Sequence, residues 1–519
     1  MARSPQQIGP APWAGSAALA ALLALVLGSF AAVLARAEGF GALVAADWAA
    51  LRFTLWQAVL SAGLSCLLAV PVARALARRQ FPGRNFLITA LGAPFILPVI
   101  AAIIGLLAIF GRAGALNAGL SALGLPQITI YGPQGVIIAH VFLNLPLAVR
   151  LLLNGWAAIP AERFRLAAAL DFGPRDIARL LEWPMLRQTM PGAALAIFLI
   201  CLTSFTVALT LGGGPAATTL ELAIYQAFRI EFDLAHAASL AGLQMGLSLL
   251  AAVLCLKVLT TQGFGAGLDR PVERWDSAGW AQRLADMIWL ALMTTFLLGP
   301  IAMVLAHGLP QMANLPTSVW PALGGSILIA LSATFIALCL SLAIALLITG
   351  CGPKTGRSID AAAMLSLTAS PLVLGTGLFL ILRPLVNPVA WALVVIALVN
   401  AAMAMPFCLR ALLPALRTLR ADYDRLADSL DMAGLARLRW LILPRLRRPL
   451  GFAGGLAAAL SMGDLGVVTL FADPSRASLP MQIYALTSAY RNDQAAAAAI
   501  VLIVASFALF WAFDRWGRN

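Results

Sequence analysis

Long apolar blocks recur along the whole chain and indicate a membrane protein. Of its 519 residues, 61% are hydrophobic and only 11% are charged, whereas a soluble chain has about a quarter of its residues charged. About 20 apolar residues span the roughly 30 Å of bilayer hydrocarbon. Twelve blocks of that length are centred near residues 27, 65, 98, 145, 201, 248, 296, 336, 372, 400, 460 and 504. We therefore expect an all-α membrane protein with about 12 transmembrane helices.

The net charge of +13 comes mainly from basic residues in the segments between the apolar blocks. If the N-terminus is cytoplasmic and the spans alternate, 28 of the 35 basic residues fall on the cytoplasmic side, as the positive-inside rule requires. We therefore expect a multi-pass protein of the bacterial inner membrane with both termini in the cytoplasm. The basic charge then needs no nucleic-acid partner, and the chain carries no nucleic-acid recognition module.

Cysteine and histidine are too scattered to predict a metal site. The six cysteines lack C-x-x-C spacing and the three histidines are far apart in the sequence, so we expect neither a disulfide framework nor a bound metal. No G-x-x-x-x-G-K-[S/T] sequence occurs either, which argues against ATP hydrolysis by this chain. We expect no cofactor here and no catalytic residue.

The chain contains a tandem repeat. A shift of 260 residues aligns 146–187 with 406–447 without a gap, and 15 of the 42 pairs are identical. Arg-Leu-Ala-x-x-Leu-Asp recurs whole, at 165–171 and at 425–431. We predict a first repeat at 1–260, a polar cytoplasmic linker at 261–285 and a second repeat at 286–519, with six spans in each and both repeats in the same orientation.

The repeated segment forms a loop between the fourth and fifth spans of each repeat, at 156–190 and 413–449. Apolar residues at helical spacing lie on both sides of a break, which predicts two short helices at an angle. Asp171 could supply the break as an N-cap, or Gly173 with Pro174 could supply it. A proline, Pro184 or Pro444, is then expected to start the next span.

These loops resemble the EAA loop of binding-protein-dependent importer permeases. The pattern of that family is Glu-Ala-Ala, three residues, Gly, and then a Leu-Pro whose proline lies thirteen residues after the Gly. Here Asp171 and Asp431 replace the Gly, and we expect the bend to persist because Asp tolerates left-handed backbone. An ordinary amphipathic loop with basic residues at the headgroups is the alternative.

The resemblance implies type I permease folds and a coupling role for the loops. In the family this loop sits in a groove of a separate ATPase subunit. The resemblance therefore implies an ATPase partner, expected in two copies, that binds ATP and Mg. The positions that match the family's loop are Arg165, Leu166, Ala167, Leu170, Asp171, Gly173 and Pro184, and then Arg425, Leu426, Ala427, Leu430, Asp431, Gly434 and Pro444.

Two further stretches, 211–228 and 463–471 with Leu479, Pro480 and 489–491, resemble the fused thiamine-transport permeases of that family. This resemblance implies import of thiamine, or of thiamine phosphates, delivered by a periplasmic binding protein. Iron(III) permeases of the same architecture remain an alternative. A secondary transporter could also have parallel repeats, but it would not need the paired cytoplasmic loops.

Asp464 is a candidate for the substrate path, because a carboxylate near the centre of a span costs about 2.5–3.5 kcal/mol and could attract a cationic thiazolium. Capping of a broken helix or a local ion pair would explain it equally. Ser204 is the repeat mate of Asp464, and Thr206 lies beside it. Tyr225 and Tyr484 could stack on an aromatic cation or belong to an aromatic belt.

Overall fold

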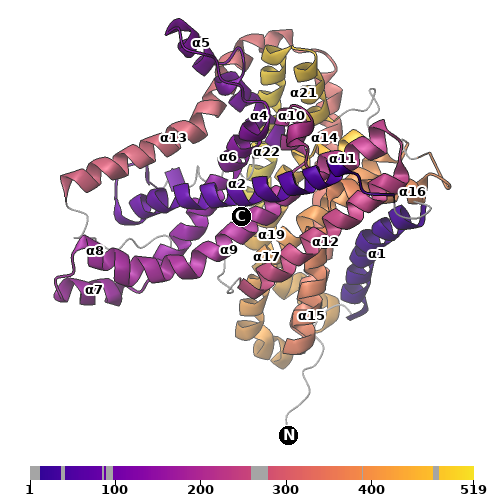
Figure 1. The fold of residues 1–519 in the computed structure, drawn as a ribbon. Coiled ribbons are helices and arrows are strands. Elements are labelled where there is room, and N and C mark those ends of the chain that lie inside the picture. The colour runs from indigo at the N-terminus through magenta and orange to yellow at the C-terminus, as the bar shows by residue number, and fades with distance from the viewer. Residues whose placement is uncertain are drawn as a thin grey trace. The chain divides into compact units, whose positions relative to one another are not determined.

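The computed structural model describes residues 12–36, 41–84, 87–88, 97–258, 279–387, 390–471 and 478–518, and these residues contain helices and no strands (Figure 1). Among the described residues, eleven helices are long and apolar enough to cross a membrane. A twelfth crossing is possible if the pair 353–366 and 371–382, bent by 82°, counts as one span. The predicted all-α membrane fold is confirmed. Most of the predicted linker, 261–278, lies outside the described residues.

The chain forms two compact units that we describe separately. Unit 2 contains residues 44–222 and 250–311. In it α2, α6 and α9 pack together, and α13 packs against α2 and α4. Its helices are α2 (Ala45–Arg78), α4 (Val99–Phe110), α5 (Ala115–Ala122), α6 (Pro133–Ala157), α7 (Ala161–Ala169), α8 (Pro174–Ile177), the π-turn η2 (Ala178–Glu182), α9 (Trp183–Leu202), α10 (Thr206–Leu211), η3 (Pro215–Ala217) and α13 (Trp280–Gly308).

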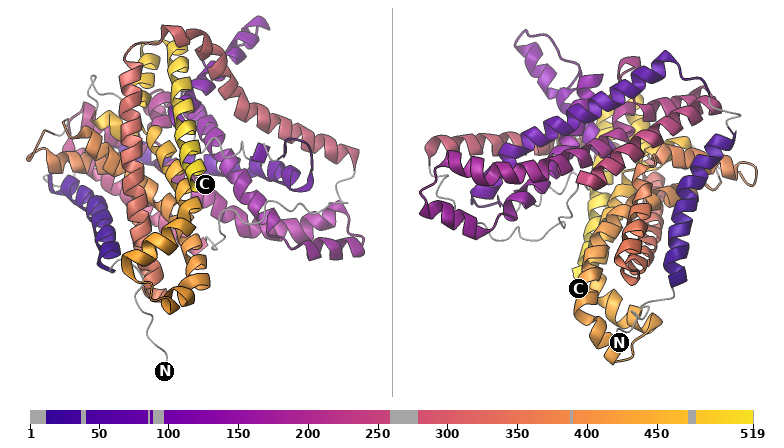
Figure 2. Two further views of the ribbon diagram at one scale, coloured as in Figure 1. Left: turned by 180° about the vertical axis from the view of Figure 1, so that it is seen from behind. Right: turned by 60° about the horizontal axis from the view of Figure 1, so that its bottom comes forward.

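Unit 1 contains residues 1–43, 223–249 and 312–519. Its central helices α14, α17, α19 and α22 run side by side (Figure 2). Its helices are α1 (Pro12–Arg36), η4 (Gln226–Ile230), α14 (Val319–Gly350), α15 (Pro353–Ala363), η7 (Met364–Thr368), α16 (Pro371–Leu382), α17 (Ala392–Ser429), α18 (Gly434–Arg437), the π-turn η8 (Leu438–Ile442), α19 (Leu443–Met462), α20 (Gly466–Leu470), α21 (Leu479–Ser488) and α22 (Asn492–Arg518). Three helices run across a unit boundary: α11 (Leu220–Tyr225), α12 (Leu234–Val258) and η6 (Leu309–Asn314).

Small residues allow the helices of unit 1 to pack closely. Ala333 on α14, Ala401 on α17 and Ala453 on α19 belong to one buried cluster. Packing of this kind drives helix association in lipid, because apolar burial gives no advantage there. The order of packed helices is the same in the two units: α2, α6 and α9 correspond to α14, α17 and α19.

The compact units do not follow the two repeats. Helix α1, from the first repeat, packs against α14 and α16 of the second. A Cβ atom on Gly377 would lie 2.1 Å from the carbonyl oxygen of Ser29, so α16 and α1 meet backbone to backbone. Helix α13, from the second repeat, packs against α4 and α2 of the first. The first helix of each repeat is therefore exchanged into the unit built from the other repeat.

Candidate functional site

Both repeated loops end their first helix in the same way. The φ angles of Asp171 and Asp431 are 53° and 52°, in the left-handed region. In the first loop, the N–H of Phe172 bonds to the Ala167 carbonyl over 3.0 Å and the N–H of Asp171 bonds to that of Ala168 over 3.1 Å. This pair of bonds is a Schellman motif, in which the left-handed position is usually glycine. The bend expected at the two aspartates is present.

The N-cap prediction for Asp171 is wrong. Asp171 terminates the first helix, and the second helix is capped by Gly173 in the first loop and by Ala433 in the second. The carboxylate of Asp176 accepts the N–H of Gly173 over 3.1 Å, and Pro174 occupies the first helical position as expected. A proline fits that position because its missing N–H would have no partner there.

The two prolines that were expected to start a span lie inside a continuous helical run. Helix α8 passes through η2 into α9, and α18 passes through η8 into α19. In the two π-turns, the N–H of Trp183 bonds to the Ala178 carbonyl and the N–H of Leu443 bonds to that of Leu438. Because proline cannot donate and its ring crowds the preceding turn, each widened turn accommodates the proline that follows it.

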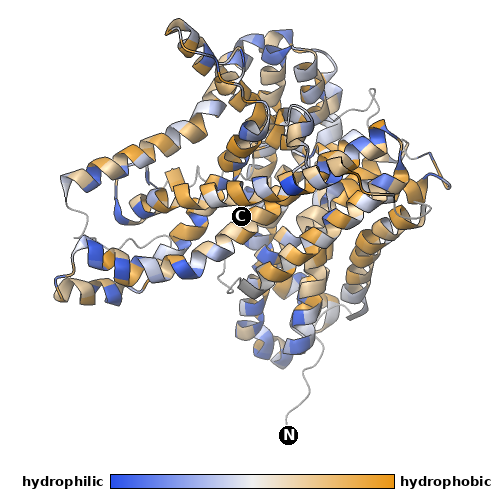
Figure 3. Cartoon of the chain, in the orientation of Figure 1, coloured by the Kyte–Doolittle hydropathy of each residue, from blue (hydrophilic) through white to orange (hydrophobic). Residues whose placement is uncertain are grey.

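The two loops expose the same leucines. The side chains of Leu166 and Leu170 are 62% and 57% exposed, and those of their mates Leu426 and Leu430 are 53% and 63% exposed. Arg165 and Arg425 are exposed beside them. In contrast, Ala167 and Ala427 are buried within the chain and lie beneath the exposed leucines. The ribbon of α7 and α8 includes many hydrophilic residues (Figure 3).

The buried support beneath the leucines differs between the loops. In the second loop Arg437 is buried and donates to Asp424 over 2.6 Å and to Asp428 over 3.0 Å. At an offset of 260 residues, the first loop has Ile177, Phe164 and Ala168 in these places. Ile177 and Phe164 are buried. An ion-pair cluster in one repeat therefore replaces an apolar cluster in the other.

The opposite exchange occurs one helical turn further on. Glu182 is buried, forms a salt bridge with Arg74 at 2.7 Å and accepts from the Trp156 indole over 3.3 Å. Its repeat mate is Ile442, which is buried in an apolar core. Buried charge has thus been placed at different points of the two loops, while the exposed Arg165, Leu166 and Leu170 recur as Arg425, Leu426 and Leu430.

Asp464 lies where the fifth span of the second repeat breaks between α19 and α20. One carboxylate oxygen accepts the N–H of Gly466 over 3.1 Å, and the other is buried without a hydrogen-bond partner. Close by, the amide of Asn400 donates to the Ser461 hydroxyl over 2.9 Å. Asp464 therefore caps the broken helix and also presents an unsatisfied oxygen.

The first repeat has its own polar cluster at matching positions. His140 and Cys201 are the mates of Asn400 and Ser461 at an offset of 260 residues. The amide of Asn144 donates to the His140 carbonyl over 2.9 Å and to the Cys201 sulfur over 3.5 Å. Both ring nitrogens of His140 are buried without a partner. These paired polar positions were not identified from the sequence, although the repeat offset could have revealed them.

The other predicted path residues divide between the units. Ser204 and Thr206 lie at the break between α9 and α10 in unit 2 and are half-buried. Tyr225 and Tyr484 lie near each other in unit 1, where burial raises the pKa of Tyr225, Tyr484 adds to the increase, and Arg229 opposes it. Among the residues that the structure describes, no group of three or more His, Cys, Asp or Glu side chains could hold a metal ion.

A further cluster near the end of α2 was also missed. Asp286 on α13 is buried and accepts from Arg78 over 2.8 Å and from Arg79 over 2.7 Å. The sequence signal for this cluster is weak. Asp286 lies within an apolar block of the second repeat, and Arg78 and Arg79 end an apolar block of the first. These bonds fix α13 against α2 in unit 2.

Curated relatives match nearly the whole chain, whereas no family model matches it. A thiamine transport system permease protein of Brucella abortus is 40% identical over 517 residues, which is 97% of this chain and 95% of the relative. The one from Escherichia coli is 39% identical over 488 residues, or 91% and 90%. The chain belongs to the thiamine transport system permease family. The resemblance drawn from residues 211–228 and 463–471 is thereby confirmed.

A shorter relative of the permease is consistent with the repeat. A molybdenum transport system permease protein of Azotobacter vinelandii is 29% identical over 224 residues, which is 43% of the permease and 97% of that relative. Nearly the whole length of that relative thus matches less than half of the permease. All three relatives are named as transport system permease proteins.

Proposed function

We propose that this chain forms the translocation path of an ATP-driven importer for thiamine or its phosphate esters. The path lies in the bacterial inner membrane, and a periplasmic binding protein delivers the substrate. The family membership and the names of the full-length relatives support the substrate. The pair of loops supports ATP-driven coupling. No residue of this chain is assigned to ATP hydrolysis, so ATP and Mg are bound by a separate partner.

The observation that carries the coupling role is the repetition of one exposed surface on two loops. The exposed leucines Leu166 and Leu170 recur as Leu426 and Leu430, although the buried residues beneath them have changed. An exposed apolar side chain that is retained while its support changes is typical of a contact surface. Two equal surfaces fit two copies of one ATPase subunit.

The path itself is assigned to the polar residues at the two broken spans. Asp464 offers an unsatisfied carboxylate oxygen to a cation, and a charge in low-dielectric surroundings interacts strongly with an opposite charge. Ser204 and Thr206 occupy the corresponding break in the first repeat. Tyr225 and Tyr484 provide aromatic rings that could attract the thiazolium.

Growth on scarce thiamine tests the substrate. In a strain that cannot synthesise thiamine, deletion of this permease should abolish growth on low external thiamine while iron uptake stays normal. Reconstitution with the ATPase and the binding protein should give ATP hydrolysis that thiamine stimulates. Loss of iron uptake with normal thiamine uptake would instead assign the permease to iron(III).

A further inference from the structure

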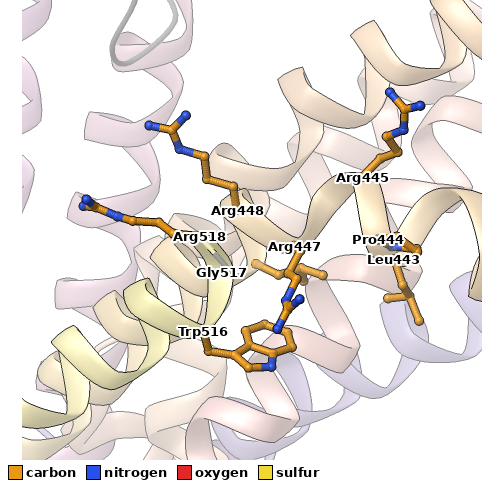
Figure 4. A pocket seen from close by; sticks show the side chains of 9 residues that line it. Leu443, Pro444, Arg445, Arg447, Arg448, Trp516, Gly517 and Arg518 are labelled. Atoms are coloured by element: carbon orange, nitrogen blue, oxygen red, sulfur yellow. The ribbon is translucent and has the colours of Figure 1, made fainter.

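A cavity of about 520 Å³ lies where α19 begins and α22 ends, in unit 1 (Figure 4). Four arginines line it: Arg445, Arg447 and Arg448 from α19, and Arg518 from α22. The rest of the lining is largely apolar and consists of Leu443, Pro444, Leu450, Trp516 and Gly517. The cavity therefore combines a strongly basic rim with an apolar wall.

Two glycines bring the arginines of the two helices together. A Cβ atom on Gly451 would lie 2.5 Å from the Phe513 carbonyl oxygen, and one on Gly517 would lie 2.9 Å from that of Arg447. Neither position has room for a side chain, so α19 and α22 touch at this point. This close approach holds the like charges near one another without any covalent link.

The acidic groups nearby do not balance this charge. Asp514 pairs with Arg518 at 2.6 Å. Arg445 donates to the Tyr423 hydroxyl over 2.5 Å, and Arg447 lies 5.2 Å from the centre of the Trp516 ring. Within the described part of the chain, neither Arg447 nor Arg448 forms a salt bridge. Like charges that are held together without a counter-ion destabilise a folded protein, so an anion here would relieve repulsion.

The location of the cavity indicates where that anion comes from. It lies at the ends of two membrane-spanning helices, on the side that carries the second coupling loop, because Leu443 directly follows η8. Tryptophan is enriched at the headgroup level of membranes, and Trp511 and Trp516 flank this end of α22. Basic pockets between spans recognise anionic lipid headgroups.

We propose that this cavity binds the phosphate headgroup of an anionic phospholipid from the leaflet that faces the coupling loops. Arg447 and Arg448 supply charge-assisted hydrogen bonds to the phosphate oxygens, for which the guanidinium fork is well suited. Leu450 and Trp516 pack against the glycerol and the first acyl carbons. A free phosphate would use the arginines but would have no need of the apolar wall.

Native mass spectrometry of the purified, delipidated permease tests this proposal in the absence of any ATPase. Phosphatidylglycerol should bind and raise the melting temperature, whereas phosphatidylcholine with the same acyl chains should not. The double variant R447Q/R448Q should bind phosphatidylglycerol about thirtyfold more weakly, since each of the two basic residues near an anionic lipid contributes about 1 kcal/mol.

The repeat provides a matched control. Arg187 is the mate of Arg447, but the mates of Arg445 and Arg448 are Met185 and Gln188, so the first repeat lacks this cluster. R187Q should bind phosphatidylglycerol as tightly as the unmodified chain. If the double variant fails to fold, R448A replaces it, because the Arg448 side chain is exposed and removing it disturbs no packing.

Three outcomes would overturn the proposal. Equal binding of the two lipids would show that charge is not recognised, and unchanged binding in R447Q/R448Q or in R448A would place the lipid elsewhere. Displacement of the lipid by millimolar inorganic phosphate, with the same rise in melting temperature, would identify a site for a free anion.

Discussion

Arg437 donates to Asp424 over 2.6 Å beneath the second coupling loop, at the positions where the first loop packs Ile177 against an apolar cluster. One bend is thus supported by two different chemistries. A buried ion pair and a well-packed apolar cluster of similar size can have similar net stability, although breaking either one is costly. The comparison of the two loops therefore distinguishes the exposed residues that both loops share from the buried residues that support the bend and can differ.

Exchange of the whole cluster tests this separation. R437I alone should lower the free energy of unfolding by about 2–4 kcal/mol, because Asp428 loses its partner and Asp424 keeps only Arg420. The triple variant R437I/D424F/D428A installs the cluster of the first loop and should recover most of that loss. Thermal unfolding of the purified protein measures both changes. I177R in the first loop is the converse control and should destabilise, and an equal effect of the single and triple variants would contradict the equivalence.

The left-handed residues give a second prediction. D171G and D431G should be neutral or slightly stabilising, since glycine adopts φ near +53° without a steric cost. D171V should cost about 1–2 kcal/mol, because a branched side chain clashes in this conformation. A169V introduces the same side chain into right-handed helix nearby and should cost less. The melting temperatures of the purified variants measure these effects. An equal decrease for D171V and A169V would show that the left-handed backbone at Asp171 is not the cause of the destabilisation.

The exposed leucines are predicted to contact the ATPase. In L170D/L430D each new carboxylate would be buried in the interface with the ATPase, and an unpaired buried carboxylate costs several kcal/mol. Membrane insertion should persist, while co-purification of the ATPase and transport should be lost. L123D is the control, since Leu123 is even more exposed, at 75%, but lies outside both loops. Normal transport by L170D/L430D would show that these surfaces are not used.

Asp464 is predicted to act through its charge. D464N keeps an oxygen that can accept the N–H of Gly466, so the cap on the broken span should survive. Transport should weaken while binding-protein docking and basal ATP hydrolysis continue. D360N is a matched control, because Asp360 pairs with Arg410 elsewhere in unit 1. D464N could instead lose thermal stability while the protein that remains folded transports normally. That result would show that Asp464 only caps the broken helix.

Topology provides the remaining prediction. In a background without the six native cysteines, a cysteine at position 218 should react with an impermeant thiol reagent added from outside. One at position 175, in the first coupling loop, should not react until the membrane is opened. The distribution of basic residues supports this orientation, and the reverse labelling pattern would invert it.

Hydropathy and the repeat predicted most of the spans and both coupling loops, because span length and backbone preference are local properties. Asp171 was expected to tolerate a left-handed bend and does so, but its role as an N-cap was misassigned, since Asp suits either end of a break. The single helix α17 was not anticipated. Pro160 separates α6 from α7, whereas its mate Arg420 lets the helix continue through the loop.

Partner choice between distant helices could not be predicted from the sequence. An apolar helix has the same composition whichever neighbour it packs against, so nothing in the α1 segment specifies α14 and α16. The buried ion pairs are also hard to recognise from the sequence. Arg437 looks like one of many basic loop residues until its distances to Asp424 and Asp428 are known.

The exchange of α1 and α13 between the compact units has a consequence for biosynthesis. Helix α1 is made first, yet its neighbour α16 ends only at Leu382. At about 5–20 residues per second, α1 waits in the bilayer for tens of seconds before its neighbours are inserted. Throughout that interval the surface around Ser29, which later contacts Gly377, must be covered by something else, such as lipid or an insertion chaperone. Joining the repeats in one polypeptide ensures that the helix it finally meets comes from the same molecule.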